Sequence, residues 1–125
     1  MVGHLPVVAI VDDEPHFRRA LERLLINTGF EARQFASGDE FLQHLDGIDC
    51  AILDLHMAGM SGFDVQKALA SRGSHIPVVV LTGNDTPANR ARSLADGACA
   101  YLTKPVDVDQ LLQTLGSLPQ PAPHP

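Results

Sequence analysis

Four apolar runs in this chain end in polar residues whose side chains could take part in chemistry. The acidic pair Asp12 and Asp13 follows VVAIV, Asp54 follows CAIL, Thr82 follows IPVVVL, and Lys104 follows ACAYLT. Three carboxylates that converge at one place repel one another unless a divalent cation compensates their charge. An oxygen-only ligand set with room for water suits Mg²⁺ better than zinc. The residue types therefore predict a magnesium site.

The same residues can support transfer of a phosphoryl group. An ionised carboxylate such as that of Asp54 is a nucleophile for phosphorus, provided that the transferred oxygens meet positive charge and hydrogen-bond donors. The cation, the ammonium of Lys104, the hydroxyl of Thr82 and nearby backbone N–H groups would supply both. We therefore expect Asp54 to be the phosphoacceptor, with Thr82 and Lys104 binding the phosphate.

Each of these residues also has a purely structural interpretation. Asp12, Asp13 or Glu14 could cap a helix, Thr82 could be an ordinary strand residue, and Lys104 could be a solvated surface cation. Taken singly, these interpretations are about as plausible as the functional ones. Their joint occurrence after successive apolar runs favours the functional interpretation.

The segments that must position these residues alternate between two kinds of pattern. Short apolar or β-branched runs predict five strands, at Val7–Val11, Glu31–Phe35, Cys50–Leu53, Ile76–Thr82 and Ala98–Thr103. Residues at helical spacing predict five helices, with apolar faces within 17–28, 41–45, 65–69, 88–95 and 108–118. Asp107 is the expected N-cap of the last helix.

The fourth predicted helix has the weakest apolar face. Ala88, Ala91, Leu94 and Ala95 are its only apolar residues at core-facing spacing, so we expect it to be held loosely. Strands alternating with helices favour an α/β fold, a doubly wound parallel sheet of five strands with five helices. In such sheets the working site lies outside the carboxyl ends of the strands, where the polar residues are predicted to lie.

Composition limits the alternatives. With 125 residues, 45% of them hydrophobic, the chain has the size of one domain, expected to span residues 1–118. The proline-rich segment 119–125 reads as a tail or linker. A net charge of -6 without a basic run gives no sign of direct nucleic-acid contact, and no apolar run is long enough for a membrane span. We expect a cytoplasmic protein, with Cys50 and Cys99 as small buried core residues.

The chain resembles the receiver domains of two-component response regulators over residues 6–118. The resemblance rests on the acidic pair DD, on LDLHMAGMSG around Asp54, on LTG with Thr82, and on AYLTKP with Tyr101 and Lys104. The DLHMAGMSGFD and LTGNDT segments are most similar to receivers attached to helix-turn-helix transcription regulators. The resemblance implies a flavodoxin-like fold with strand order 2-1-3-4-5.

The resemblance also implies how the metal would be held. Asp13 and the carboxylate of Asp54 would bind Mg²⁺ directly, the backbone carbonyl of His56 would be a third protein ligand, and Asp12 would act through a bound water. The phosphoryl group would come from the phosphohistidine of a sensor histidine kinase, from a phosphotransfer protein or from a small phosphodonor. The chain would catalyse only its own phosphorylation and dephosphorylation, and would not be a metabolic enzyme.

A phosphorylated receiver is expected to signal through its surface. Thr82 would shift toward the phosphate and Tyr101 would turn inward, changing the surface formed by the fourth helix, fifth strand and fifth helix. That surface would control an output domain beyond the C-terminus or formation of a homodimer. Alternatively, Tyr101 is a half-buried strand aromatic whose hydroxyl meets water.

Two residues depart from the usual receiver pattern. Ala58 stands where many receivers have proline, which would leave the turn after Asp54 less rigid. His56 is a less usual side chain at its position. We hypothesise that His56 and Asn84 flank the path of attacking water and tune hydrolysis, the alternative being that both are solvated loop residues.

Three other functions compete with this interpretation. A receiver-like module could signal by protein contact without phosphate, but all five expected site residues are present. A phosphatase of the haloacid dehalogenase kind would need a second acid where this chain has His56. A flavodoxin-like small-molecule binder would need a phosphate-cradling loop in place of the acidic pair that ends at Asp13.

Overall fold

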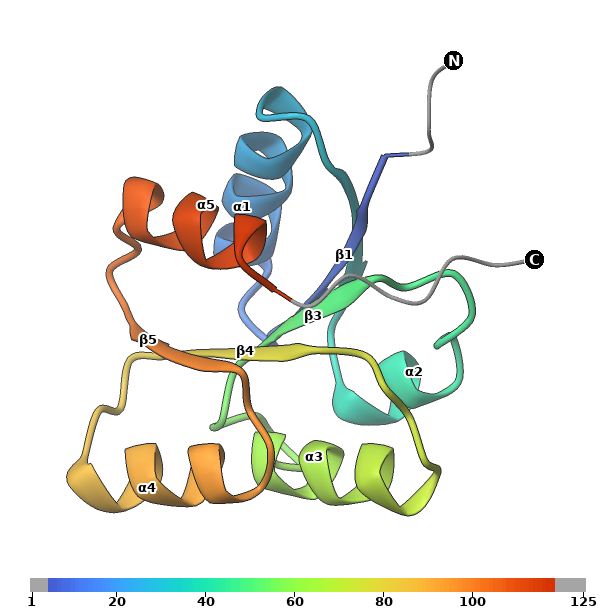
Figure 1. The fold of residues 1–125 in the computed structure, drawn as a ribbon, viewed down its shortest axis with the longest axis vertical. Coiled ribbons are helices and arrows are strands. Elements are labelled where there is room, and N and C mark those ends of the chain that lie inside the picture. Colours follow the sequence, from blue (N-terminus) through green and yellow to red (C-terminus); the bar gives the residue numbers. More distant parts are fainter. Residues whose placement is uncertain (1–4, 119–125) are drawn as a thin grey trace.

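The computed structural model describes residues 5–118, and the segment 119–125 lies outside the described residues. Strands and helices alternate along the chain (Figure 1), in the order β1 Val7–Val11, α1 Pro15–Asn27, β2 Glu31–Phe35, α2 Gly38–Leu42, β3 Cys50–Leu53, α3 Gly62–Ser71, β4 Val78–Thr82, α4 Pro87–Ala95, β5 Ala100–Thr103 and α5 Val108–Gly116. Each predicted strand and helix is present, although several ends differ.

The five strands form one parallel sheet in the order β2-β1-β3-β4-β5, which confirms the predicted topology. Val8 of β1 pairs with Cys50 of β3, and Val80 of β4 pairs with Tyr101 of β5. The chain leaves β1 on one side and β3 on the other, so strand order reverses between these two neighbours. The carboxyl ends of β1 and β3, after Val11 and Leu53, therefore lie side by side.

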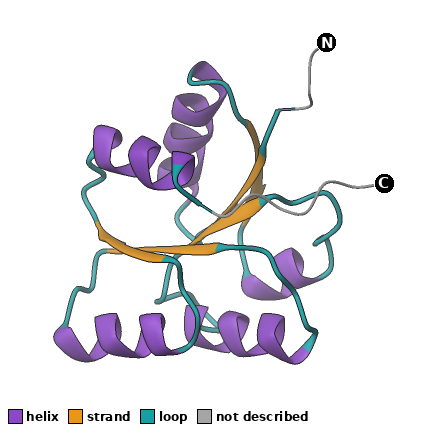
Figure 2. Cartoon of the chain, in the orientation of Figure 1, coloured by secondary structure: helices purple, strands orange, loops and turns teal. Residues whose placement is uncertain are grey.

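The sheet is the middle of three layers (Figures 1 and 2). Helices α1 and α5 cover one face, whereas α2, α3 and α4 cover the other. Every residue of β1, β3 and β4 is buried, as their continuously apolar sequences predict for strands covered on both sides. Alternate strand residues enter two separate cores, one containing Phe41 and Val65, the other Leu25 and Leu111.

Local signals explain where the helices begin. Glu14 caps α1, with its carboxylate oxygens accepting from the backbone N–H groups of His16 and Phe17. Asp107 caps α5, as predicted, by accepting from the N–H of Gln110 at 3.0 Å. None of the helices between residues 5 and 118 is long and apolar enough to cross a membrane.

Helix α2 and strand β5 are shorter than predicted. Helix α2 ends at Leu42 because the next bonds run from residue i to i−3, with the N–H of His44 donating to the carbonyl of Phe41. Strand β5 begins at Ala100, two residues later than predicted. Cys99 therefore precedes the strand and is exposed, so the prediction of a buried core cysteine is wrong there but correct for Cys50. Burial raises the pKa of Cys50 to about 12.

The prediction of which residues of α4 face the core is wrong. Ala88, Ala91, Leu94 and Ala95 are all exposed, and Ser93 is the only buried residue in this helix. The residues that α4 meets on α3 account for this orientation, because a buried glutamine lies under Ser93 and the ring of Phe63 lies under Arg92. A helix with so weak an apolar stripe is oriented by its neighbours.

Candidate functional site

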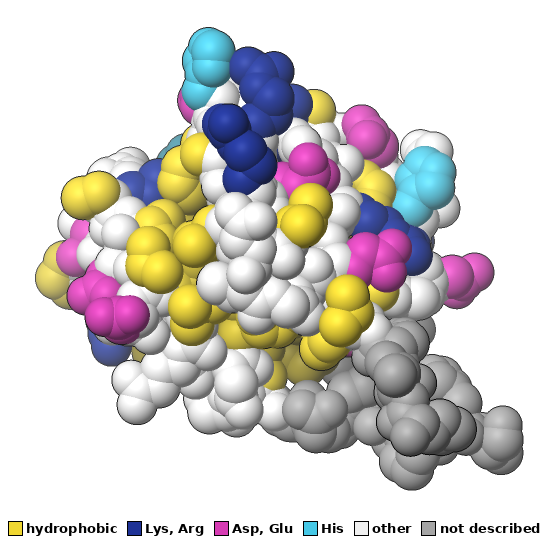
Figure 3. All heavy atoms as spheres, turned by 90° about the horizontal axis from the view of Figure 1, so that it is seen from above, with side chains coloured by type: hydrophobic (Ala, Val, Ile, Leu, Met, Phe, Trp, Pro, Cys, Tyr) yellow, Lys and Arg dark blue, Asp and Glu magenta, His cyan; other side chains and the backbone are white. Residues whose placement is uncertain are grey.

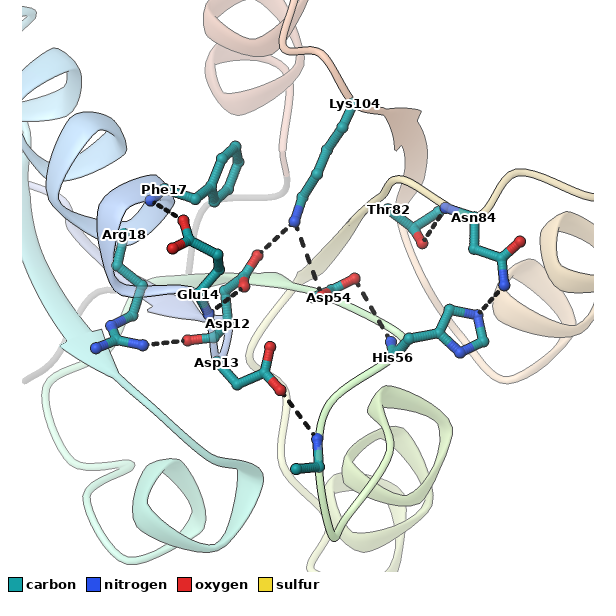
Figure 4. Close-up of polar contacts among 11 residues, drawn as sticks. Asp12, Asp13, Glu14, Phe17, Arg18, Asp54, His56, Thr82, Asn84 and Lys104 are labelled. Carbon is teal, nitrogen blue, oxygen red and sulfur yellow. Dashed lines mark hydrogen bonds and ion pairs between the residues drawn. The ribbon is translucent and has the colours of Figure 1, made fainter.

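The predicted site residues converge at the carboxyl edge of the sheet (Figure 4). Asp12 and Asp13 follow β1, Asp54 follows β3, and one carboxylate oxygen from each lies within 4.8 Å of the others. This convergence results from the topology, since β1 and β3 are adjacent parallel strands that end together. Asp54, which directly follows the apolar run of β3, is thereby brought beside Asp12 and Asp13.

Asp12 is 2% exposed, and both of its carboxylate oxygens already have donors. Its Oδ1 accepts from the N–H of Glu14 at 2.9 Å, and its Oδ2 accepts from Nζ of Lys104 at 2.7 Å. Of the three acids that could have capped α1, it is Glu14 that does so. Asp12 is therefore free to hold Lys104 at the site.

Lys104 reaches across the site from the end of β5. Its Nζ lies 2.7 Å from Asp12 Oδ2, 3.8 Å from Asp54 Oδ2 and 4.1 Å from the centre of the Phe17 ring. The side chain is only 23% exposed, so the interpretation of Lys104 as a solvated surface cation does not hold. An ammonium held by an acid and an aromatic face is fixed beside Asp54.

Asp54 is 8% exposed and sits at the centre of these contacts. Burial raises the pKa of its carboxyl above the usual range, the charge of Lys104 acts in the opposite direction, and the charge of Asp12 raises it further. Helix α3 begins directly against this segment, and a side chain at Gly62 would collide with the main chain of Asp54 and Leu55. Close approach therefore requires glycine there.

We expect Asp54→Asn to raise the free energy of unfolding at neutral pH, without divalent cations. With its pKa raised in the native state, Asp54 binds its proton more tightly when folded, so the ionised carboxylate destabilises the native state above that pKa. The two proteins should become equally stable as the pH falls below the ordinary value of 3.8. Denaturant unfolding between acidic and neutral pH measures this.

Asp46→Asn is the matched control, because Asp46 is exposed and should show no such pH-dependent gain. Mg²⁺ should narrow the difference in the free energy of unfolding between the native protein and Asp54→Asn. A cation that binds the folded state stabilises it, and the native protein keeps the carboxylate at position 54. A native protein more stable than Asp54→Asn at neutral pH without cations would contradict the expected cost of ionising Asp54.

Asp13 is exposed at the rim of the site, and its Oδ2 accepts from the N–H of Ala58 at 3.0 Å. Proline at position 58 would have no N–H to donate. Besides leaving the turn less rigid, Ala58 thus supplies a hydrogen bond that its sequence position did not predict. It ties the loop after β3 to Asp13, leaving the other carboxylate oxygen toward Asp12 and Asp54 (Figure 4).

Thr82 ends β4 and is fully buried. Its Oγ1 accepts from the N–H of Asn84 at 3.1 Å, which leaves the hydroxyl proton available for an incoming oxygen. The side chains of Asn84 and His56 meet beyond it, with Nδ2 of Asn84 3.1 Å from Nε2 of His56 (Figure 4). The two residues are thus in contact and are not independently solvated.

Asn89 also reaches the site, which the sequence did not predict. It lies in the first turn of α4, where its Nδ2 donates to the backbone carbonyl of Asn84 at 2.9 Å and lies 3.4 Å from Nε2 of His56. Its position five residues after Asn84 could have suggested a place near the same rim. Without knowing which side of α4 faces inward, the contact could not be predicted.

Tyr101 of β5 is buried, and its hydroxyl donates to Oδ1 of Asp85 at 3.1 Å. Burial and then the neighbouring Asp85 raise the pKa of this phenol. The guanidinium of Arg90 lies 5.4 Å from the ring centre. The ring is thus inward in this structure, and the half-buried alternative does not describe it.

The acidic group fits a hard divalent cation. Asp12, Asp13 and Asp54 present only oxygen ligands, and among residues 5–118 they form the one cluster of three acidic, cysteine or histidine side chains close enough to share an ion. Since both oxygens of Asp12 already accept hydrogen bonds, Asp13 and Asp54 are better placed for direct coordination. An oxygen-only set that leaves room for waters is typical of Mg²⁺.

Comparison with known proteins agrees with this geometry. The family model for the response regulator receiver domain matches residues 8–116. Nodulation protein W of Bradyrhizobium diazoefficiens is 34% identical over 111 residues, covering 87% of this chain and 49% of that protein. Sensory transduction protein RegX3 of Mycobacterium tuberculosis is 39% identical over 107 residues, covering 84% and 47% respectively.

Solved structures show the same fold. Chemotaxis protein CheY4 of Vibrio cholerae superposes with a TM-score of 0.83 at 30% identity, covering 90% of this chain and 98% of that one. A response regulator receiver protein of Pseudomonas putida has a TM-score of 0.84 at 28% identity, covering 94% and 100%. The chain belongs to the response regulator receiver domain family. It spans about half the length of the curated relatives it matches.

Proposed function

We propose that the protein is a phosphoacceptor switch, in which Asp54 accepts a phosphoryl group in a Mg²⁺-dependent reaction. The observation that supports this most directly is the position of Asp54 between two further acids and the ammonium of Lys104. A phosphate-independent receiver would have no need for this arrangement of charge. Membership of the receiver family supports phosphoacceptor signalling in general.

The reaction is a phosphoryl transfer. A carboxylate oxygen of Asp54 attacks phosphorus, the bond from phosphorus to the donor breaks, and the donor nitrogen or oxygen leaves with the bonding electrons. Lys104 compensates charge on the transferred oxygens, and the hydroxyl of Thr82 donates to one of them. Asp13, Asp54 and the backbone carbonyl of His56 would hold Mg²⁺, with Asp12 acting through a water. When bound, Mg²⁺ supplies further charge compensation to the phosphoryl oxygens.

The test is incubation with Mg²⁺ and a small acyl phosphate, followed by intact mass measurement and peptide mapping. We expect one labile phosphoryl adduct, located on Asp54, and none when a chelator removes the cation. An adduct on another residue, or no adduct with a donor that phosphorylates a known receiver, would contradict the proposal and favour signalling by protein contact alone.

We propose that His56 and Asn84 tune hydrolysis of the phosphorylated aspartate. Their side chains meet at 3.1 Å across the mouth of the site, so the pair can restrict attacking water. His56→Ala and Asn84→Ala should each shorten the lifetime of phosphorylated Asp54 about two- to tenfold, the range that one hydrogen bond supports. Loss of the adduct over time measures the lifetime, and unchanged rates in both variants would eliminate the role.

We propose that Thr82 and Tyr101 carry the signal to the surface formed by α4, β5 and α5. Phosphate would draw Thr82 toward the site and change the space available to Tyr101, shifting populations between two states. Tyr101→Ala should therefore lose most of the phosphorylation-dependent change in self-association or output while still accepting phosphate. Light scattering with and without phosphodonor measures it, and an unaltered response would remove Tyr101 from the pathway.

We propose a sensor histidine kinase or phosphotransfer protein as the phosphoryl source and an output domain joined beyond the C-terminus as the target. Homodimer formation on phosphorylation is the alternative output. Figure 3 shows several Lys and Arg side chains gathered at the upper end of the face it views and a group of apolar side chains left of its centre, with no basic stripe crossing that face. With a net charge of -6, this agrees with a protein partner rather than nucleic acid. We also propose that the protein works in the cytoplasm.

A further inference from the structure

Helix α4 rests on its neighbours through polar groups. Ser93 is its only buried residue, and it faces Gln66 of α3, which is 3% exposed. Nε2 of Gln66 donates to the carbonyl of Ser93 at 3.0 Å, while its Oε1 has no hydrogen-bond partner among the described residues. A direction-dependent polar contact of this kind fixes which side of α4 turns inward.

The inward side of α4 continues from Ser93 to the site. Asn89, one turn earlier, lies on the same side, and the hydroxyl of Ser93 donates to its carbonyl at 2.8 Å. The side chain of Asn89 then reaches the loop after β4, where its Nδ2 donates to the carbonyl of Asn84 at 2.9 Å. The orientation of the helix is thus coupled to the position of Asn84.

Two amide groups face the same imidazole nitrogen. Nδ2 of Asn84 lies 3.1 Å and Nδ2 of Asn89 lies 3.4 Å from Nε2 of His56. Two amide side chains therefore contact the same edge of the ring and limit how the ring can turn. A ring held in this way lies between the loop that follows Asp54 and the first turn of α4 (Figure 4).

We propose that Asn89 is a positioning residue for the phosphoryl site, holding the imidazole of His56 and the main chain of Asn84 at the mouth of the site. Through Asn89, the orientation of α4 sets how far His56 restricts water from phosphorylated Asp54. This role deepens the proposed function and depends on it for its effect on lifetime. The effect on the His56 ring does not depend on phosphorylation.

Asn89→Ala is a clean test because the helix should survive it. Thr86 caps α4 by accepting from the backbone N–H of Asn89, which the substitution keeps, and alanine favours helix more than asparagine. Asn27→Ala is the matched control, since Asn27 is exposed at the end of α1 on the other side of the sheet. Melting temperatures of the three proteins establish that folding is retained.

The first measurement is nitrogen NMR of the His56 ring in the unphosphorylated protein. We expect the chemical shifts of the two ring nitrogens to be the same in the native protein and in Asn27→Ala, and to change in Asn89→Ala, because the ring loses its contact with the Asn89 amide. A ring signal that does not change in Asn89→Ala would overturn the positioning role. Because no phosphate is involved, this outcome is independent of whether Asp54 is the acceptor.

The second measurement is the lifetime of phosphorylated Asp54. We expect Asn89→Ala to shorten it about two- to tenfold, with Asn27→Ala unchanged, as for loss of one hydrogen bond. In a His56→Ala background, Asn89→Ala should have less than its full effect, because part of its action passes through His56. An additive effect in the double variant, or an unaltered or longer lifetime in Asn89→Ala, would overturn the proposal.

Discussion

Asp54→Asn is expected to abolish acceptance of a phosphoryl group. The amide nitrogen and oxygen of asparagine are poor nucleophiles, and the other carboxylates cannot take over. Asp12 is engaged by Lys104 and the N–H of Glu14, and Asp13 lies at the exposed rim. Incubation with Mg²⁺ and a small acyl phosphate, followed by mass measurement, should show an adduct on the native protein only.

The control for this experiment is Asp46→Asn, which changes an exposed acid away from the site and should accept phosphate at the native rate. An adduct on Asp54→Asn at the native rate would show that another residue is the acceptor. Because Asp54→Asn is expected to stabilise the fold, loss of the adduct in this variant should reflect loss of the acceptor and not unfolding.

Lys104→Met is expected to slow phosphorylation of Asp54 by about 10²- to 10³-fold, the cost of removing one charge-stabilising donor from a reacting centre. The ammonium of Lys104 lies 3.8 Å from Asp54 and is directed there by Asp12 and the Phe17 ring. Methionine keeps the length and packing of the side chain while removing the charge. Initial rates of adduct formation at saturating Mg²⁺ measure the effect.

Lys67→Met is the matched control, because Lys67 is exposed on α3 and the substitution is the same. It should leave the rate unchanged. Loss of Lys104 also leaves Asp12 buried without its partner, so the stability of Lys104→Met must be measured beside its rate. A folded Lys104→Met protein that is phosphorylated within threefold of the native rate would exclude charge compensation by Lys104. A threefold change in rate is roughly what loss of a weak surface ion pair would cause.

The positions of the site residues could be predicted because each of these residues follows an apolar run in the sequence. The runs of β1, β3 and β4 are continuously apolar, and such runs are stable only as strands covered on both faces. Parallel strands bring their carboxyl ends to one edge, so the residues after them had to converge there. The cluster of Asp12, Asp13 and Asp54 follows from this argument.

The choice among equivalent local groups could not be predicted. Three consecutive acids could each cap α1, yet Glu14 is the cap, whereas Asp12 accepts a hydrogen bond from Lys104, 92 residues away in the sequence. The strand resemblance of the segment before Ala100 likewise concealed that Cys99 is exposed. Alternative caps differ by only about 1 kcal/mol, so the sequence pattern alone does not select among them.

The amino-acid sequence by itself determined the succession of strands and helices along the chain, the edge of the sheet where the candidate site lies and the residue types available there, because burial of the apolar runs outweighs weaker local preferences. Only the tertiary structure decided the orientation of α4. Its apolar stripe is too thin to dominate, so the contact between Ser93 and Gln66 turns the helix and brings Asn89 to His56. Where apolar burial is small, single polar contacts between distant segments select the arrangement.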